Sequence, residues 1–226
     1  MEKKKRKKYR PFIRFVIGLG RVFTRRQKVV GKCPDSPCVY LVRHLDTGGV
    51  IGSFKSIPVV MRPWVLDIFH SYDEAKRQFK DYTFSVRMKK SKAFCAVVSP
   101  IAARFLVSLV HSANSIPVYR GDKALKTITT IRESVKALEN EDNLLIFPDV
   151  EYADVDDKSG GEIYKGFIAV DKLYFKRTGS HVKFVPVFMS KKKVVIHPPV
   201  TFEEGREDET YAKIVDGIYN ESLSEE

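Results

Sequence analysis

The residues best suited to chemistry follow a short apolar run at positions 39–42. Arg43, His44 and Asp46 come directly after that run. A histidine titrates near neutral pH and can act as a general base, while a nearby carboxylate can orient its ring. The apolar run predicts a buried strand, and the glycine pair at 48–49 predicts a sharp turn after it. Because α/β proteins place chemistry beyond the carboxyl ends of strands, this stretch is the first candidate site.

Two later apolar runs end in polar residues of similar kinds. Residues 116–120 predict a short strand that ends at Arg120, and residues 144–147 predict a buried strand followed by Asp149. Residues beyond the carboxyl ends of parallel strands share one crevice, so these side chains are expected to meet His44. Arginine binds phosphate in a bidentate manner, which indicates a phosphate-bearing substrate. The alternative is structural: a strand-end histidine, a solvated arginine and a turn cap.

The elements that must position these residues alternate between strands and helices along the chain. Further strands are predicted at 182–189 and 194–196, and helices at 71–90, 125–138, 166–177 and 209–222. This alternation predicts an α/β fold with a mainly parallel sheet flanked by helices. Residues 93–110 are strongly apolar but contain Pro100 and Arg104, which disfavour a membrane span. We expect a pair of helices there, either buried in the protein or half-sunk in a membrane interface.

The positive charge of the chain lies at its N-terminal end. The net charge is +12, and residues 1–32 hold 13 lysines and arginines against one acid, Glu2, so the rest of the chain is neutral. A basic arm of this kind meets a polyanion, either a membrane surface or a nucleic acid. We therefore expect an arm, residues 1–32, and a single domain, residues 33–226.

The middle of this arm has the pattern of an amphipathic helix. Four arginines, at 10, 14, 21 and 25, fall on a narrow stripe, and apolar residues between 12 and 23 cover the rest. This pattern favours a helix lying on an anionic bilayer, at the cytoplasmic face and without a span. The alternative is a helix that packs its apolar face on the protein. A nucleic-acid partner is disfavoured because it needs no apolar face.

The three cysteines do not indicate a metal site. Cys33 and Cys38 lack a second cysteine or histidine pair at zinc spacing. We expect reduced thiols, and neither a metal nor another cofactor.

The order of these motifs resembles the glycerolipid acyltransferases, the lysophosphatidic acid acyltransferase family. The resemblance covers about residues 37–200: the His44 turn, I-P-V-Y-R-G at 116–121, L-L-I-F-P-D at 144–149, K-G-F at 165–167 and V-P-V at 185–187. That family has an N-H-x-x-x-x-D block, a block ending in arginine, an F-P-E-G-T-R block, a K-x-G helix start and a closing V-P-V strand.

The resemblance implies transfer of an acyl group from acyl-CoA or acyl carrier protein to the free hydroxyl of a lysophospholipid-type acceptor. It implies that His44 is the base and that Arg120 binds the acceptor phosphate, with Arg43 or Lys165 as possible helpers. Asp149 matches the acid of F-P-E, and Lys165 with Gly166 matches the K-x-G block.

Two departures from the family pattern leave alternatives open. The aspartate expected five residues after His44 is replaced by Gly49, and Val150-Glu151-Tyr152 replaces G-T-R. Asp46 is one substitute for the missing acid; Asp149, Glu151 and Asp154 on the following loop are others. Two hypotheses follow: a divergent acyltransferase, or a non-catalytic relative that binds lipid or a partner protein.

Overall fold

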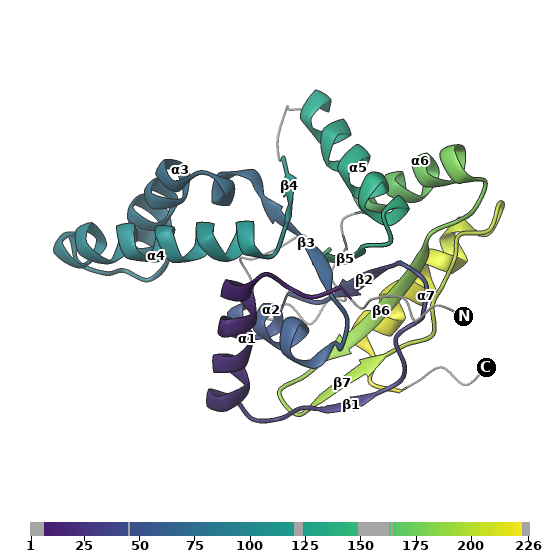
Figure 1. The fold of residues 1–226 in the computed structure, drawn as a ribbon, viewed down its shortest axis with the longest axis horizontal. Helices are drawn as coiled ribbons and strands as arrows, with labels where there is room; N and C mark the ends of the chain where they lie inside the picture. Colours follow the sequence, from purple (N-terminus) through teal and green to yellow (C-terminus); the bar gives the residue numbers. More distant parts are fainter. Residues whose placement is uncertain (1–6, 45, 120–123, 149–162, 164, 223–226) are drawn as a thin grey trace. The chain divides into compact units, whose positions relative to one another are not determined.

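The computed structural model describes residues 7–44, 46–119, 124–148, 163 and 165–222 (Figure 1). The fold is mixed α/β, with a seven-stranded, mostly parallel sheet in the order β1-β7-β6-β2-β5-β3-β4 and helices flanking it. The predicted α/β class, with a mainly parallel sheet flanked by helices, is therefore confirmed. The chain divides into two compact units. The larger comprises residues 16–62 and those after 130, and the smaller comprises residues up to 15 and those from 63 to 130.

The larger unit is organised around β2, whose five residues are all buried. Its strands are β1 (Lys28–Val30), β2 (Cys38–Val42), β5 (Asn143–Ile146), β6 (Lys183–Met189) and β7 (Lys193–Ile196). β2 lies between β5 and β6 and is parallel to both, so Leu41 stands opposite Ile146 on one side and Pro186 on the other. β7 is antiparallel to β6, and β1 is parallel to β7. A strand paired on both edges and covered on both faces is apolar throughout, as observed for β2.

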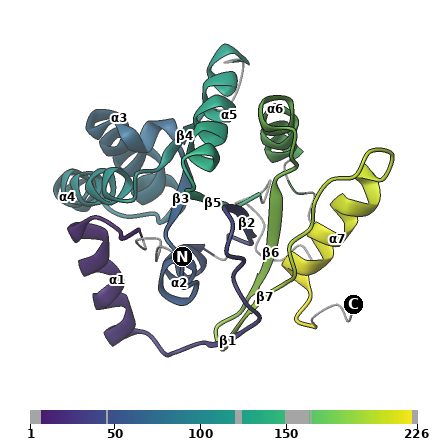
Figure 2. The ribbon, with the colours of Figure 1, turned by 45° about the vertical axis from the view of Figure 1, so that its right-hand side comes forward.

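The helices of the larger unit lie close to the predicted positions, except α2, which was not predicted. They are α2 (Asp46–Ser56), η3 (Lys165–Phe167), α6 (Ile168–Thr178), α7 (Glu207–Tyr219) and the second half of α5 (Ala124–Glu139). α6 ends at Gly179, which has a left-handed φ of 72°. α7 lies along β6 (Figure 2), and a Cβ added at Gly217 would lie 2.7 Å from Cβ of Pro186. The close approach of this helix therefore requires glycine at 217.

The smaller unit contains the longest helix of the described chain. Its elements are η1 (Asp67–His70), α3 (Tyr72–Arg77), the π-helix η2 (Gln78–Arg87), α4 (Lys92–Ser112), β4 (Ile116–Val118) and most of β3 (Met61–Leu66). β3 pairs in parallel with β4, with Trp64 opposite Ile116. The helix predicted from Ser71 begins as expected, but the Ser71 side chain makes no capping hydrogen bond.

The pair of helices predicted for residues 93–110 is wrong, because α4 runs unbroken through Pro100. A proline inside a helix removes one backbone hydrogen bond and costs about 3 kcal/mol. Cys95, Ser99 and Ala103 are buried on either side of it, so this part of the helix packs against the protein. By length and composition alone, α4 is able to cross a bilayer; 22% of its most apolar window is buried in the protein.

Candidate functional site

His44 lies at the carboxyl end of β2, beside the end of the neighbouring strand β5. The two strands are parallel and in register, so the residues that follow them emerge at one edge of the sheet. The rings of His44 and Phe147 meet edge to face, with centroids 5.0 Å apart and an interplanar angle of 65°. His44 is half-buried, whereas Arg43 is exposed. The structure thus brings the predicted base against the first residue of the F-P-D segment.

The sharp glycine turn predicted after His44 is wrong, because α2 begins at Asp46 and includes the glycine pair at 48–49. Another glycine of this helix, Gly52, lies close to β6. A Cβ at Gly52 would lie 2.8 Å from Sδ of Met189 in β6. The Ser53 hydroxyl donates a hydrogen bond to the Gly49 carbonyl over 2.8 Å. His44 consequently stands just before a helix N-terminus, where backbone N–H groups and the helix dipole favour negative charge.

The acids around His44 are placed as follows. Gly49, at the position of the family's aspartate, is buried within α2 and carries no carboxylate. Asp46 is the first residue of α2, three residues before Gly49. The other predicted residues around this edge, Arg120, Asp149, Glu151 and Asp154, lie outside the described residues.

Two of the predicted substrate-binding cations lie over tyrosines of α7. The Arg43 guanidinium carbon lies 5.0 Å from the ring centre of Tyr219, and Nζ of Lys165 lies 4.4 Å from that of Tyr211. Such cation–π contacts hold a cation in place while leaving its N–H groups available to an anion. Sequence reasoning missed both tyrosines, because nothing local links a C-terminal helix to these cations.

Tyr211 is itself held by a hydrogen bond, since its hydroxyl donates to the carbonyl of Ile163 over 3.0 Å. Ile163 lies two residues before the K-G-F segment, in which Gly166 is half-buried and Phe167 is fully buried. α7 therefore supports the segment that carries Lys165 and Gly166.

The predicted V-P-V block forms the middle of β6 and connects β2 to α7. The Pro186 carbonyl accepts a hydrogen bond of 3.1 Å from the backbone N–H of His197. Nε2 of His197 donates to the carbonyl of Asn220 over 3.2 Å, which joins the end of β7 to the end of α7. Burial lowers the pKa of His197 below its ordinary value of 6.5, against smaller opposing effects of that carbonyl and of Asp216.

The cysteines are free thiols within this structure. Burial raises the pKa of Cys33, and it raises the pKa of Cys38 to about 11. Both sulfurs therefore stay protonated at neutral pH, so neither is an activated nucleophile. Within the described part of the chain, no group of three His, Cys, Asp or Glu side chains is placed to hold a metal ion.

The helix of the basic arm, α1 (Pro11–Phe23), has two apolar faces. Ile13 and Ile17 are buried against the protein. A second set of apolar side chains is exposed: Phe12, Phe15, Leu19, Val22 and Phe23. One face of the helix therefore packs on the protein, as the alternative interpretation predicted, and another remains accessible.

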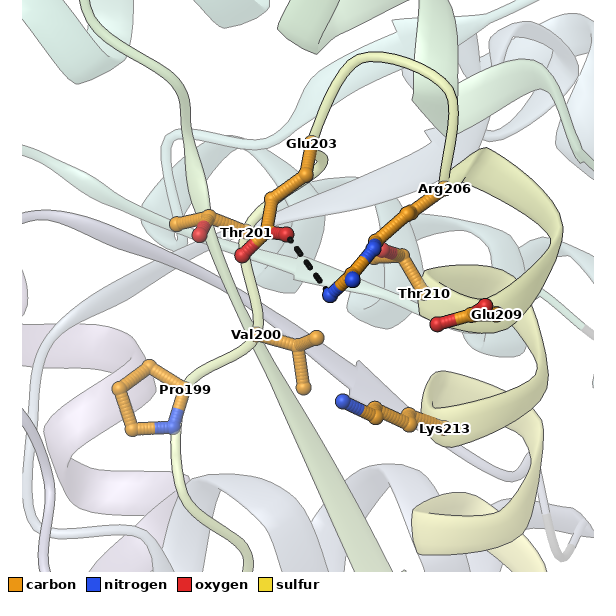
Figure 3. A pocket seen from close by; sticks show the side chains of 8 residues that line it. All are labelled: Pro199, Val200, Thr201, Glu203, Arg206, Glu209, Thr210 and Lys213. Atoms are coloured by element: carbon orange, nitrogen blue, oxygen red, sulfur yellow. Dashed lines mark ion pairs between the residues drawn. The ribbon is translucent and has the colours of Figure 1, made fainter.

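A shallow pocket of about 200 Å³ lies between the 199–206 segment and α7 (Figure 3). Its lining residues are Pro199, Val200, Thr201, Glu203, Arg206, Glu209, Thr210 and Lys213. An ion pair of 3.7 Å between Arg206 and Glu203 occupies one side. None of the predicted site residues lines it, and it is smaller than the usual ligand site of about 300 Å³ or more.

No protein-family model, no curated protein and no solved structure matches this chain. The fold and the site define a mixed α/β protein with a histidine at the carboxyl edge of a mostly parallel sheet.

Proposed function

We propose that this protein is a divergent acyltransferase that works at a membrane surface. It moves an acyl group from a thioester, acyl-CoA or acyl carrier protein, to the free hydroxyl of a lysophospholipid-type acceptor. The observation that carries the proposal is the edge-to-face contact between His44 and Phe147. Through this contact the His44 block and the F-P-D block lie at the same sheet edge. The family resemblance implies that these two blocks act together.

In the proposed reaction His44 removes the proton from the acceptor hydroxyl, and the oxygen attacks the thioester carbonyl. The tetrahedral intermediate then expels the thiolate, which takes the proton from the His44 imidazolium, giving a free thiol and the acyl ester. The nearby N-terminus of α2 favours negative charge at this edge. The acyl thioester is the co-substrate, and the proposal includes no metal or other cofactor.

The other predicted site residues bind the acceptor or orient the base. Arg120 binds the acceptor phosphate, assisted by Arg43 or Lys165, and the segments of Asp149 and Gly166 line the acceptor site. Asp46 is the candidate nearest in sequence for orienting the imidazole. The cation–π contacts of Arg43 and Lys165 with α7 support this assignment, because a held cation loses little freedom on binding phosphate.

The proposed location is the cytoplasmic face of a membrane, without a span. The exposed apolar side chains of α1 lie on a helix that follows a polybasic tract. A peripheral helix of this kind combines burial of apolar side chains with attraction to anionic lipid. Such attachment gives the sheet edge that carries His44 access to acceptors that reside in the bilayer.

The test is release of free thiol by the purified full-length chain with acyl-CoA and a lysophospholipid in anionic vesicles. His44→Ala is expected to lower turnover about a thousandfold, because the base is lost. His181→Ala, a histidine that pairs with Asp171 away from β2, is the matched control and should retain turnover. Full turnover by His44→Ala would contradict the mechanism.

A second candidate function is lipid binding without chemistry, and Gly49 favours it. Loss of the orienting acid in a comparable catalytic triad costs about four orders of magnitude in rate. This candidate predicts saturable binding of lysophospholipid to the purified protein, with no thiol release from any donor in a broad panel. Thiol release abolished by His44→Ala would exclude it.

A further inference from the structure

α4 has a buried face and an exposed apolar face on opposite sides of the helix. Cys95, Ser99 and Ala103 are buried on one side. The other side carries four exposed apolar residues, which we call the outer stripe: Phe94 (39% exposed), Val97 (65%), Ile101 (67%) and Phe105 (50%). Their spacing of three and four residues places them on one helix face. Large apolar side chains aligned in this way mark an interaction surface.

The segment of sequence that carries the outer stripe holds only basic charges, although α3 and η2, which pack on α4, carry Asp73, Glu74 and Asp81. The sequence contains no acid between Asp81 and Asp122. Five cations lie in the described part of that interval: Arg87, Lys89, Lys90, Lys92 and Arg104. Nζ of Lys90 lies 5.9 Å from the ring centre of Phe94, so a cation stands at the start of the stripe. An apolar surface with a cationic border matches an anionic bilayer, which supplies both hydrocarbon and phosphate.

The outer stripe continues onto the first turns of α1. The rings of Phe12 and Phe105 meet edge to face with centroids 5.7 Å apart. The backbone N–H of Ile13 donates to Oγ of Ser112 over 3.0 Å, which fixes the start of α1 to the end of α4. Phe15, one turn further along α1, is 65% exposed. The two helices therefore offer a joined apolar surface within the smaller unit.

We propose that the outer stripe of α4 lies in the interface of an anionic bilayer, with the helix parallel to the membrane plane. This inference rests on the proposed membrane-surface function and adds α4 to α1 as a membrane-contacting element. A spanning orientation would expose the whole circumference of α4 to lipid, whereas Cys95, Ser99 and Ala103 pack against protein. It would also place Arg104 near the bilayer centre, at a high cost.

The first test compares two exposed isoleucines on helices of this protein. Ile101→Glu places a charge on the outer stripe, and Ile128→Glu places one on α5, where Ile128 is 43% exposed. Binding of the full chain to vesicles of phosphatidylglycerol and phosphatidylcholine is measured by sedimentation at high salt. Ile101→Glu is expected to weaken binding about tenfold or more, and Ile128→Glu to leave it unchanged. The proposal would be overturned if Ile101→Glu bound vesicles as tightly as wild type, or if both variants lost the same amount of vesicle binding.

A gain-of-binding variant separates the proposal from a folding defect. Val97→Trp is expected to strengthen vesicle binding, because tryptophan favours the membrane interface. Weaker or unchanged binding by a folded Val97→Trp would count against the outer stripe.

The orientation is tested with fluorophores attached at Phe94→Cys and Phe105→Cys in a protein that carries Cys33→Ser, since Cys33 is half-buried whereas Cys38 and Cys95 are buried. Quenching by lipid-borne quenchers should place both labels at the same shallow depth. Depths that increase from one label to the other would overturn the parallel orientation in favour of a span. Lipid-free dimers that Ile101→Glu dissociates would instead identify a second copy as the occupant.

Thiol release is measured on the same samples with a short-chain, water-soluble lysophospholipid. Wild-type protein that binds vesicles through the outer stripe but releases no thiol would contradict the catalytic proposal alone. If the protein releases thiol but Ile101→Glu binds vesicles as tightly as wild type, the α4 proposal alone is contradicted.

Discussion

The imidazole of His44 meets the ring of Phe147 edge to face, with centroids 5.0 Å apart and a sequence separation of 103 residues. The contact exists because β2 and β5 are adjacent and parallel, so each residue follows its own strand at the same edge. Edge-to-face aromatic contacts favour one relative orientation of the rings. Phe147 therefore restricts the direction in which the His44 nitrogens point.

Removing the Phe147 ring should reduce turnover by freeing the His44 imidazole to reorient. Phe147→Ala is expected to lower kcat about tenfold with little change in KM, since the acceptor contacts remain. Phe147→Leu keeps most of the volume packed against the core and isolates the loss of the aromatic edge. Steady-state thiol release, corrected for the folded fraction, checks this prediction. A change confined to KM would show that Phe147 contacts substrate rather than positioning the histidine.

Restoring an acid at position 49 should raise catalysis. Gly49→Asp puts a carboxylate five residues after His44, at the spacing of the resembling family, and near a helix N-terminus that favours negative charge. Turnover is expected to rise about tenfold or more, because the acid fixes the tautomer of the base.

Gly49→Asn is the matched control for this change, since it has nearly the same size without the charge and should give no increase. Thiol release under single-turnover conditions compares the two variants. Equal rates for wild type and a folded Gly49→Asp would indicate that another acid already orients His44.

The strands near the site could be predicted from the sequence because they are buried. β2, β5, β6 and β7 appear as short continuous apolar runs, since each is a parallel or central strand covered by other elements. β2 and β5 are neighbours, so His44 and Phe147 follow adjacent strand ends, whereas the predicted Asp149 lies outside the described residues. The 3.6-residue periodicity likewise located α5, and helices were also predicted near α6 and α7.

The features that the sequence did not predict depend on long-range packing. The glycine pair at 48–49 suggested a turn, but both glycines lie within α2, which approaches β6 so closely that a Cβ at Gly52 would lie 2.8 Å from Sδ of Met189. Pro100 suggested a helix break, but the buried neighbours of α4 stabilise a single helix. β1 has only three residues, two of them exposed, so its apolar content is too small to signal a strand.

Two helix glycines should respond to alanine with opposite signs. At Gly217 a Cβ would lie 2.7 Å from Cβ of Pro186, so Gly217→Ala should push α7 off β6 and cost about 1–3 kcal/mol of unfolding free energy. At Gly18 in α1 a Cβ would meet nothing within 4 Å. Gly18→Ala should therefore stabilise by about 0.5–1 kcal/mol, because alanine favours the helix. Urea unfolding measures both changes, and a stabilising Gly217→Ala would contradict the packing described.

His197 links β7 to α7 in its neutral form. Because Nε2 donates to the Asn220 carbonyl, the buried Nδ1 carries no proton, and it has no hydrogen-bond partner among the described residues. A proton added at Nδ1 would be a buried charge, which agrees with the lowered pKa of this histidine.

This lowered pKa should make the protein less stable in mild acid. The unfolded chain takes up the proton near pH 6.5, before the folded chain does, so stability is present above that pH and is lost as the pH falls toward the folded-state pKa. The free energy of unfolding, measured in urea from about pH 7.5 down to about pH 5, should decline. His197→Gln should reduce this loss of unfolding free energy at low pH. Part of the loss should remain, because burial also lowers the pKa of His70. An unchanged slope in His197→Gln would exclude His197 as a source of the acid sensitivity.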